Sequence, residues 1–293
     1  FIAAQGNTSI TANSLSSTSA SVVGAGIKTD GSLASSGNLN IATTQALAAN
    51  GQNLAAGDIT FTGGSVNLSG SQTSAKNIGV TTAGNLSTAN ATVVTSQNLN
   101  LSSADLNNAG GTLAASESAN FQTNALNNDA GLIQVGGDLV INTHDQTLTN
   151  TNAANYTSSN AALNGKGGIA AQGTTTLTTG DLNNDAGYLG SKGVLTATSA
   201  NISTQNGQIQ GLDHLNLIAG NGSTTGFINN TGGLIRSAAT ASLNAGEVNN
   251  SSTSTSCDCC FRTTKQAQLV STRLEASDAV GTVVSFCDHL HRV

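Results

Sequence analysis

The sequence predicts an all-β protein whose chain coils and stacks each turn on the one before, with about 20 residues per coil. Three observations carry this prediction: one motif recurs regularly along the chain, short apolar–polar alternations follow each copy, and proline is absent from the sequence. Alternation with period two is typical of β-strands, and the intervening Gly, Asn and Ser are typical of turns. A chain without proline suits sheets in which every backbone N–H donates a hydrogen bond.

The repeated motif is LNNDAG, which occurs at residues 126–131 and 182–187. Looser copies, LNNAGG and INNTGG, occupy residues 106–111 and 228–233. The shortest steps between copies give the base period, and the longer steps are accounted for by insertions, as in other repeat architectures. The series of apolar positions that begins the copies is Leu106, Leu126, Leu148, Leu182, Ile202, Ile228 and Val248.

The core of such a coil is expected to be continuous, with inward Leu, Ile and Val stacked and outward Thr, Ser and Asn facing water. Leu126, Leu182 and Ile228 are predicted to share one column of this core. With about 12 turns at a spacing of about 4.8 Å, the predicted rod is roughly 55–60 Å long.

The motif itself has two interpretations, a phosphate-binding loop or a corner of the coil. A phosphate-binding loop opens a helix and carries a lysine or an acidic partner at fixed spacing. No helical periodicity follows the copies, and GK[ST] is absent. Asn tolerates left-handed backbone conformations and Gly needs no side-chain room, so a tight corner is favoured. Stacked corners would align their asparagines in a hydrogen-bonded ladder. The predicted corner residues are Asn127, Asn128, Gly131, Asn183, Asn184, Gly187, Asn229, Asn230 and Gly233.

The composition divides the chain into repeats over residues 1–250 and a short, unrelated tail over residues 251–293. Of the 34 glycines, all but Gly281 precede the tail, and the tail contains no asparagine. All four cysteines lie in the tail, in CDCC (257–260) and CDHLH (287–291). These residues would suffice for a zinc site, but the tail that carries them is only 43 residues long. We therefore expect no metal and no cofactor.

The charge of the chain excludes some partners. A net charge of −6 with only 8% charged residues leaves no basic patch for nucleic acid. No apolar run approaches the roughly 18 residues that span a bilayer. The chain begins FIAAQGNTSI, without an initiator methionine or a signal peptide, which indicates an internal or processed piece of a longer protein.

An enzyme is the main alternative from another class, because some parallel β-helices cleave polysaccharides. Glycoside hydrolysis uses two carboxyls about 5–9.5 Å apart. Two of the acids in the repeats, Asp129 and Asp185, share the corner register and are expected to face solvent. A row of acids on one sheet would favour the enzyme, and faces covered by Ser, Thr and Asn would favour an interaction protein. We expect the protein not to be an enzyme. The acids in question are Asp30, Asp58, Asp105, Glu117, Asp129, Asp138, Asp145, Asp181, Asp185, Asp213 and Glu247.

The segments LNNDAGLIQVGGDLVIN and INNTGGLIRSAATASLNAG resemble the repeats of filamentous haemagglutinin and other two-partner secretion exoproteins, including contact-dependent growth-inhibition proteins. The resemblance covers about residues 10–250. It implies a right-handed parallel β-helix, or β-solenoid, exported through an outer-membrane partner. The family's amino-terminal secretion domain carries an NPNGI-type motif, which a chain without proline does not contain.

The function implied by this resemblance is that of a structural and interaction segment of a secreted adhesin at the bacterial cell surface. Its partners would be a receptor or glycan on a host or neighbouring cell, and the outer-membrane transporter through flanking regions. The alternative is the passive stalk of a contact-dependent growth-inhibition toxin. The step from Leu148 to Leu182 is much longer than the base period, and inserts in a solenoid form loops on one face. Tyr156 and Lys166 in this insert are the candidate contact residues.

Overall fold

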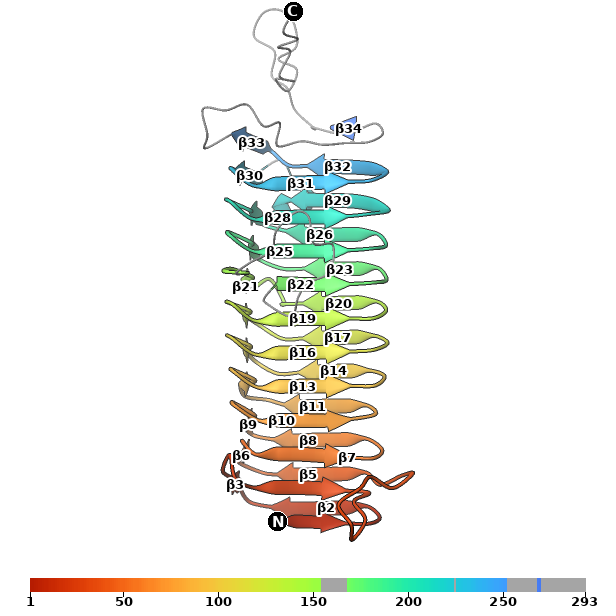
Figure 1. Cartoon of the computed structure of the whole chain (residues 1–293). Helices are drawn as coiled ribbons and strands as arrows, with labels where there is room; N and C mark the ends of the chain where they lie inside the picture. The colour runs from red at the N-terminus through yellow and green to blue at the C-terminus, as the bar shows by residue number, and fades with distance from the viewer. Residues whose placement is uncertain (154–167, 224, 252–267, 270–293) are drawn as a thin grey trace, which may run out of the picture.

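The structure is a computed structural model that describes residues 1–153, 168–223, 225–251 and 268–269. The described chain forms three parallel sheets, which we name A, B and C, running along a rod (Figure 1). Each coil contributes one strand to each sheet in turn. The predicted all-β, right-handed parallel β-helix with about 20 residues per coil is therefore confirmed.

Strands that are neighbours within a sheet come from successive coils. Sheet A consists of β1 (Ile2–Ala4), β4 (Val22–Ala25), β7 (Gln52–Ala55), β10 (Gln72–Ala75), β13 (Thr92–Thr95), β16 (Thr112–Ala115), β19 (Leu132–Val135), β22 (Gly168–Ala171), β25 (Tyr188–Ser191), β28 (Gln208–Gly211) and β31 (Leu234–Ser237). Sheet B consists of β2 (Thr8–Ala12), β5 (Leu39–Thr43), β8 (Ile59–Gly63), β11 (Ile78–Thr82), β14 (Leu99–Ser102), β17 (Ala119–Gln122), β20 (Leu139–Asn142), β23 (Thr175–Thr178), β26 (Leu195–Ser199), β29 (His214–Ala219), β32 (Thr240–Asn244) and β34 (Gln268–Leu269). Sheet C consists of β3 (Leu15–Ser17), β6 (Ala46–Ala49), β9 (Ser65–Asn67), β12 (Leu86–Ser87), β15 (Leu106–Asn107), β18 (Leu126–Asn127), β21 (Leu148–Thr149), β24 (Asp181–Asn183), β27 (Asn201–Ser203), β30 (Phe227–Thr231) and β33 (Glu247–Ser251).

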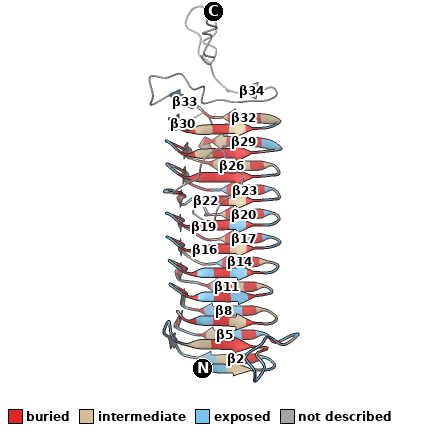
Figure 2. Cartoon of the chain, viewed as in Figure 1, coloured by how far each residue is buried: buried red, intermediate tan, exposed pale blue. Residues whose placement is uncertain are grey.

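Side chains alternate between the interior and the surface because successive residues of a strand point to opposite faces. In β8, for example, Ile59 and Phe61 are buried. Thr60 lies between them, Thr62 follows Phe61, and both threonines are exposed. Figure 2 shows this alternation along the rod. The interior is one hydrophobic core that extends through the whole coil.

One core column runs through sheet C as predicted. Leu126 pairs with its counterparts one coil below and one coil above, and the register continues to Leu182 and Ile228. All three are at most 1% exposed. The full column is Leu15, Leu47, Val66, Leu86, Leu106, Leu126, Leu148, Leu182, Ile202, Ile228 and Val248.

Sheet C has 11 strands, one fewer than the predicted 12 turns. The coil is therefore roughly 50 Å long along sheet C, at about 4.8 Å per turn. The difference arises because excursions at the corners use residues that a strict period assigns to strands. Leu15 and Leu47 are neighbours in the column, for instance, although the segment 26–38 lies between them in sequence and belongs to no sheet.

The excursions lie at corners, where an insert leaves the strand register unchanged. Residues 26–38 follow β4 in the second coil, and residues 143–147 link β20 to β21. A short 3₁₀ turn, η1 (Gly220–Gly222), lies between β29 and β30. A fourth insert separates Ala153 from β22 and contains residues 154–167, which lie outside the described residues.

The division of the chain at residue 250 stays a prediction. Strand β33 ends at Ser251, and β34 pairs with β32 at Ser242 and Leu243. The cysteines of the tail lie outside the described residues, so the structure does not test the zinc hypothesis. Across the described ranges, no helix is long and apolar enough to cross a membrane.

Candidate functional site

The first asparagine of each corner fixes the turn from the outside of the coil. Asn127 Oδ1 accepts a hydrogen bond from the backbone N–H of Asp129 at 3.1 Å, and Asn183 Oδ1 accepts one from Asp185 at 3.0 Å. This local bond from a side chain to the backbone two residues on is the Asx turn. In the third predicted copy, Asn229 Oδ1 instead accepts the hydroxyl of Thr231 at 2.9 Å.

The second asparagine of each corner points into the coil and forms a buried ladder. Asn128 and Asn184 are 0% exposed, and Asn230 is 1% exposed. The rungs are Thr88 Oγ1 to Asn108 Oδ1 (2.8 Å), Asn108 Nδ2 to Asn128 Oδ1 (2.7 Å), Asn128 Nδ2 to Asn150 Oδ1 (2.8 Å), Asn150 Nδ2 to Asn184 Oδ1 (2.7 Å) and Asn184 Nδ2 to Thr204 Oγ1 (3.0 Å). We name this set the asparagine ladder.

Each ladder amide also satisfies backbone carbonyls at the corner. Asn128 Nδ2 lies 3.1 Å from Gly131 O and 3.3 Å from Gly168 O, so one amide group links two successive coils. These bonds offset the free-energy cost of burying the polar amide groups. Asn230 continues the column by donating to Asn250 Oδ1 at 2.7 Å, but its own Oδ1 is buried with no hydrogen-bond partner among the described residues.

The corner glycines are required by close packing and not by their backbone torsion. The positive φ lies on the residue before the glycine, at 51° for Ala130, 50° for Ala186 and 66° for Gly232. A Cβ on Gly131 would collide with the carbonyl oxygen of Asn108. The glycines Gly187 and Gly233 meet the same obstacle at Asn150 O and Thr204 O, respectively.

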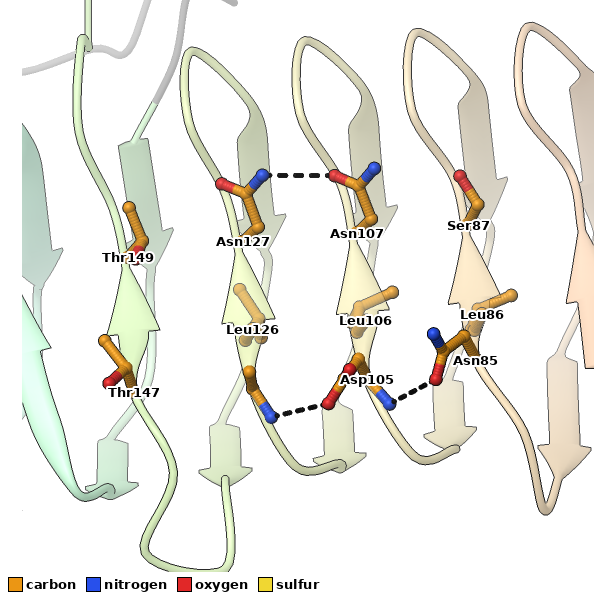
Figure 3. Close-up of a pocket in the computed structure, with 11 residues that line it drawn as sticks. Asn85, Leu86, Ser87, Asp105, Leu106, Asn107, Leu126, Asn127, Thr147 and Thr149 are labelled. Atoms are coloured by element: carbon orange, nitrogen blue, oxygen red, sulfur yellow. Dashed lines mark hydrogen bonds between the residues drawn. The ribbon is translucent and has the colours of Figure 1, made fainter.

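The outer face of sheet C carries a shallow hollow of about 420 Å³. Figure 3 shows its polar side chains in two rows that flank the short strands β12, β15, β18 and β21. Asp105 is the one carboxylate in the lining, and its Oδ1 accepts the backbone N–H of Ala125 at 3.2 Å. Asn127 Nδ2 donates to Asn107 Oδ1 at 3.3 Å across the hollow. The lining therefore combines amides, hydroxyls and aliphatic side chains with a single carboxylate. It consists of Asn85, Leu86, Ser87, Asp105, Leu106, Asn107, Ala125, Leu126, Asn127, Thr147 and Thr149.

The acids of the repeats are dispersed. In the part of the chain that the structure describes, no three His, Cys, Asp or Glu side chains gather where they could hold a metal ion. Asp129 and Asp185, expected in solvent, are half-buried because neighbouring coils donate to them. Asp129 Oδ1 accepts from the Asn152 amide at 2.6 Å, and Asp185 Oδ1 accepts from the Ser203 hydroxyl at 2.6 Å.

The two histidine motifs are separate from these acids. In THD (143–145), His144 Nδ1 lies 2.9 Å from Thr123 O. In LDH (212–214), His214 Nδ1 lies 2.9 Å from Asp213 Oδ1, and both side chains are about half exposed. Among the described contacts, His144 has no carboxylate or nucleophile beside it, and His214 has no carboxylate other than that of Asp213.

The candidate contact residues Tyr156 and Lys166 lie outside the described residues, so their role stays a prediction. The flanks of the insert are described. Ala153 N–H donates to Ala186 O at 3.1 Å, and Gly168 N–H donates to Gly131 O at 2.7 Å. The insert therefore leaves and rejoins the coil beside the asparagine ladder.

A second excursion, the hairpin at residues 26–38, was not predicted from the sequence. Ile27 and Leu33 form an antiparallel bridge, and Leu33 is 50% exposed. Lys28 N–H donates to Ser32 O at 2.8 Å, which closes the tip. The sequence held two signals for this hairpin, the Asp30–Gly31 turn dipeptide and the long step between the core residues Leu15 and Leu47.

The hairpin tip is expected to loosen in acid. The Ser32 hydroxyl, and then the Ser32 backbone N–H, donate to Asp30 and hold the pKa of its carboxyl below the ordinary value of 3.8. A lowered folded-state pKa gives stability that is present above the unfolded value and lost as the pH falls through the folded value. Amide resonances of residues 28–33 should therefore shift as the pH falls below 3.8, and the strand pairing of the coil should remain unchanged.

The control for this titration is Asp30→Asn. The amide side chain keeps an acceptor oxygen but cannot titrate, so the tip resonances of the variant should not change over the same pH interval. A shift of equal size in the variant would show that another group is responsible.

Comparisons with known proteins give two relatives. No family model matches the chain, and no solved structure matches it. The chain is 48% identical over 100 residues to Toxin CdiA of Yersinia pestis and 41% identical over 95 residues to tRNA nuclease CdiA-2 of Burkholderia pseudomallei (strain 1026b). The matches cover 34% and 32% of this chain, but only 3% of each relative.

The second relative corrects one expectation. We expected the protein not to be an enzyme, and this is wrong because a protein with the same kind of segment is named a tRNA nuclease. The expectation rested on the acids and motifs of the coil alone. A stretch that matches 3% of a relative carries no information about chemistry located elsewhere in a chain of that kind.

Each relative is similar to about a third of the chain, so the comparisons support the family resemblance over that share only. This similarity agrees with the repetitive sequence of the chain and with its parallel coil. Over this third, the chain is a relative of the CdiA contact-dependent inhibition proteins, and the resemblance to filamentous haemagglutinin-like exoproteins is confirmed.

Proposed function

We propose that the coil is a rigid stalk segment of a secreted contact-dependent inhibition exoprotein at the bacterial cell surface. The observation that carries the proposal is the unbroken column from Leu15 to Val248, paired in register at every coil of sheet C. The identity to Toxin CdiA supports the same reading. In this role the segment adds length and holds a toxin away from the cell that makes it.

Rigidity follows from how the coils are joined. Each inner strand donates and accepts backbone hydrogen bonds on both sides, and the core and the asparagine ladder add contacts along the same axis. Bending such a rod would separate coils on one side and break several of these bonds together. A stalk also needs a surface that does not attract other molecules, and a chain with 8% charged residues provides little electrostatic attraction.

The partners proposed for the whole exoprotein follow from the family. An outer-membrane two-partner secretion transporter would act through flanking regions, and a receptor or glycan on a neighbouring or host cell would be the target.

Adhesion by the coil itself is the second candidate function. The hollow on sheet C favours it, because amides and hydroxyls at successive rungs match the hydroxyls of a neutral glycan (Figure 3). Against it, no aromatic ring lines the hollow to stack on a sugar. The stalk therefore remains the better supported of the two.

Deleting residues 86–105 from the full-length exoprotein separates the two functions. Leu86 pairs with Leu106, so the deletion joins equivalent positions and removes one coil in register. The rod should shorten by about 4.8 Å and stay folded. A stalk predicts that inhibition of target cells and attachment of protein-coated beads are both unchanged, although part of the hollow is gone.

The matched control is deletion of residues 86–95, half a coil, which shifts every later strand out of register and should unfold the segment. Loss of attachment by the in-register variant, with normal surface display and an intact β spectrum, would instead support the adhesin.

A further inference from the structure

Asparagine–glycine pairs are chemically labile because glycine has no side chain to shield its backbone nitrogen. The chain contains four such pairs, which begin at Asn50, Asn164, Asn206 and Asn221. The pair at Asn164 lies outside the described residues. The other three occupy different surroundings, so the structure distinguishes their reactivity.

We propose that Asn221 is a site of spontaneous covalent modification, at which the side-chain amide becomes a carboxylate. The backbone nitrogen of Gly222 attacks Cγ of Asn221, a new N–C bond forms, and the bond from Cγ to the side-chain nitrogen breaks. That nitrogen leaves as ammonia and carries away the proton lost by the Gly222 nitrogen. Water then opens the cyclic imide at either carbonyl and gives aspartate or isoaspartate, with no oxidant or reductant required.

The surroundings of Asn221 leave its side chain free to react. Asn221 lies in η1, in the excursion between β29 and β30, and is exposed. Its φ of 49° is left-handed, and Gly220 before it has a φ of 76°. Its side chain makes no hydrogen bond to the described residues of the chain. The excursion belongs to no sheet, so the rotation that brings Cγ to the next nitrogen breaks no strand pairing.

The pair at Asn206 has the opposite surroundings. Asn206 occupies a repeated corner with a φ of 54°, so its own backbone torsion is almost that of Asn221. However, the attacking nitrogen is engaged, because Gly207 N–H donates to Thr204 O at 3.2 Å. Gly207 is also buried against the carbonyl oxygen of Asn184. Attack at this pair requires the corner to open first.

The pair at Asn50 is held through its side chain. Asn50 Nδ2 donates to Ser69 O at 2.8 Å and to Asn67 Oδ1 at 3.3 Å. Gly51 is buried, with the carbonyl oxygen of Ser21 packed against it. Asn50 must therefore lose two hydrogen bonds to the next coil before its Cγ can approach Gly51.

Modification at Asn221 would change the surface without disturbing the coil. Each conversion adds one negative charge, and the isoaspartate product also adds a methylene to the main chain. The change falls in the excursion that leads into β30, whose first residue, Phe227, is 42% exposed. The charge and shape of this corner would therefore vary with the age of the molecule, independently of its proposed role as a stalk.

The test is to age the full, folded chain in mildly alkaline buffer and to follow all three pairs in one sample by peptide mass mapping. Asn221 should convert about tenfold faster than Asn206 or Asn50, the factor expected when one hydrogen bond must first be broken. In the chain unfolded with guanidinium, the three rates should converge, because only the dipeptide then matters. The Gly222→Ala variant should slow conversion at Asn221 and leave the other two rates unchanged.

Two results would overturn the proposal. One is conversion of Asn206 or Asn50 in the folded chain at a rate equal to or above that of Asn221. The other is an unchanged rate at Asn221 in the Gly222→Ala variant, because the attacking nitrogen would then not be the backbone nitrogen of residue 222.

Discussion

Replacing Leu126 by alanine is expected to lower the free energy of unfolding by about 2–5 kcal/mol. Leu126 is 1% exposed and stacks between Leu106 and Leu148. The cavity cannot close, because backbone hydrogen bonds fix the spacing of the coils, as from Leu126 N–H to Thr147 O at 3.0 Å. The measurement is a urea denaturation series, with the midpoint and the slope compared between the variant and the parent chain.

The matched control is Val140→Ala. Val140 is an aliphatic residue on β20 of sheet B, but it points outward and is 39% exposed. Its replacement should change the free energy of unfolding by about 0.5 kcal/mol or less. Equal losses at Leu126 and Val140 would mean that the sheet C column is not the core of the coil.

The core column could be predicted from sequence because the interior accepts only one kind of side chain there. Every member from Leu15 to Val248 is Leu, Ile or Val, so the period survives insertions of different lengths. The prediction of a parallel coil needed only this periodicity and the absence of proline.

The amino-terminal coils were harder to predict because their buried asparagine lies in sheet A and not in the corner column. Asn53 and Thr73 occupy inward positions of sheet A, and Asn53 Nδ2 donates to Thr73 Oγ1 at 3.0 Å and to Ala49 O at 2.9 Å. The corner column in the same coils carries Ala49 and Leu68. In these coils the buried side-chain hydrogen bonds come from sheet A. The corners therefore carry apolar residues, and the LNNDAG pattern is absent from the sequence there.

The orientation of the corner asparagines was within reach of sequence reasoning. If Leu126 points inward, strand alternation places Asn127 outward and Asn128 inward, as the structure has them. Treating the pair as one corner unit hid this difference. The hairpin at residues 26–38 could not be placed by the period, because an excursion is constrained only at the two ends where the coil resumes.

Replacing Asn128 by alanine is expected to lower the free energy of unfolding by about 2–4 kcal/mol, since a buried group left without a partner costs about 1–3 kcal/mol. The variant removes the acceptor of Asn108 Nδ2 and the donor of Asn150 Oδ1. Asn108 Nδ2 retains longer bonds to Gly111 O and Leu132 O, at 3.3 and 3.4 Å. Asn150 Oδ1 has no such substitute, and it carries most of the loss.

The control is the adjacent residue of the same type. Asn127→Ala removes an exposed side chain that supports one Asx turn, so the loss should be about 0.5–1 kcal/mol. Within the ladder, the double variant Asn128→Ala, Asn150→Ala should lose less than the sum of the single losses, because the second change removes the group that the first left unpaired. A coupling of about 0.5–3 kcal/mol is expected for groups in one network. Strictly additive losses, or equal losses at Asn127 and Asn128, would mean that the asparagines do not act as a ladder and that the core alone holds the coils in register.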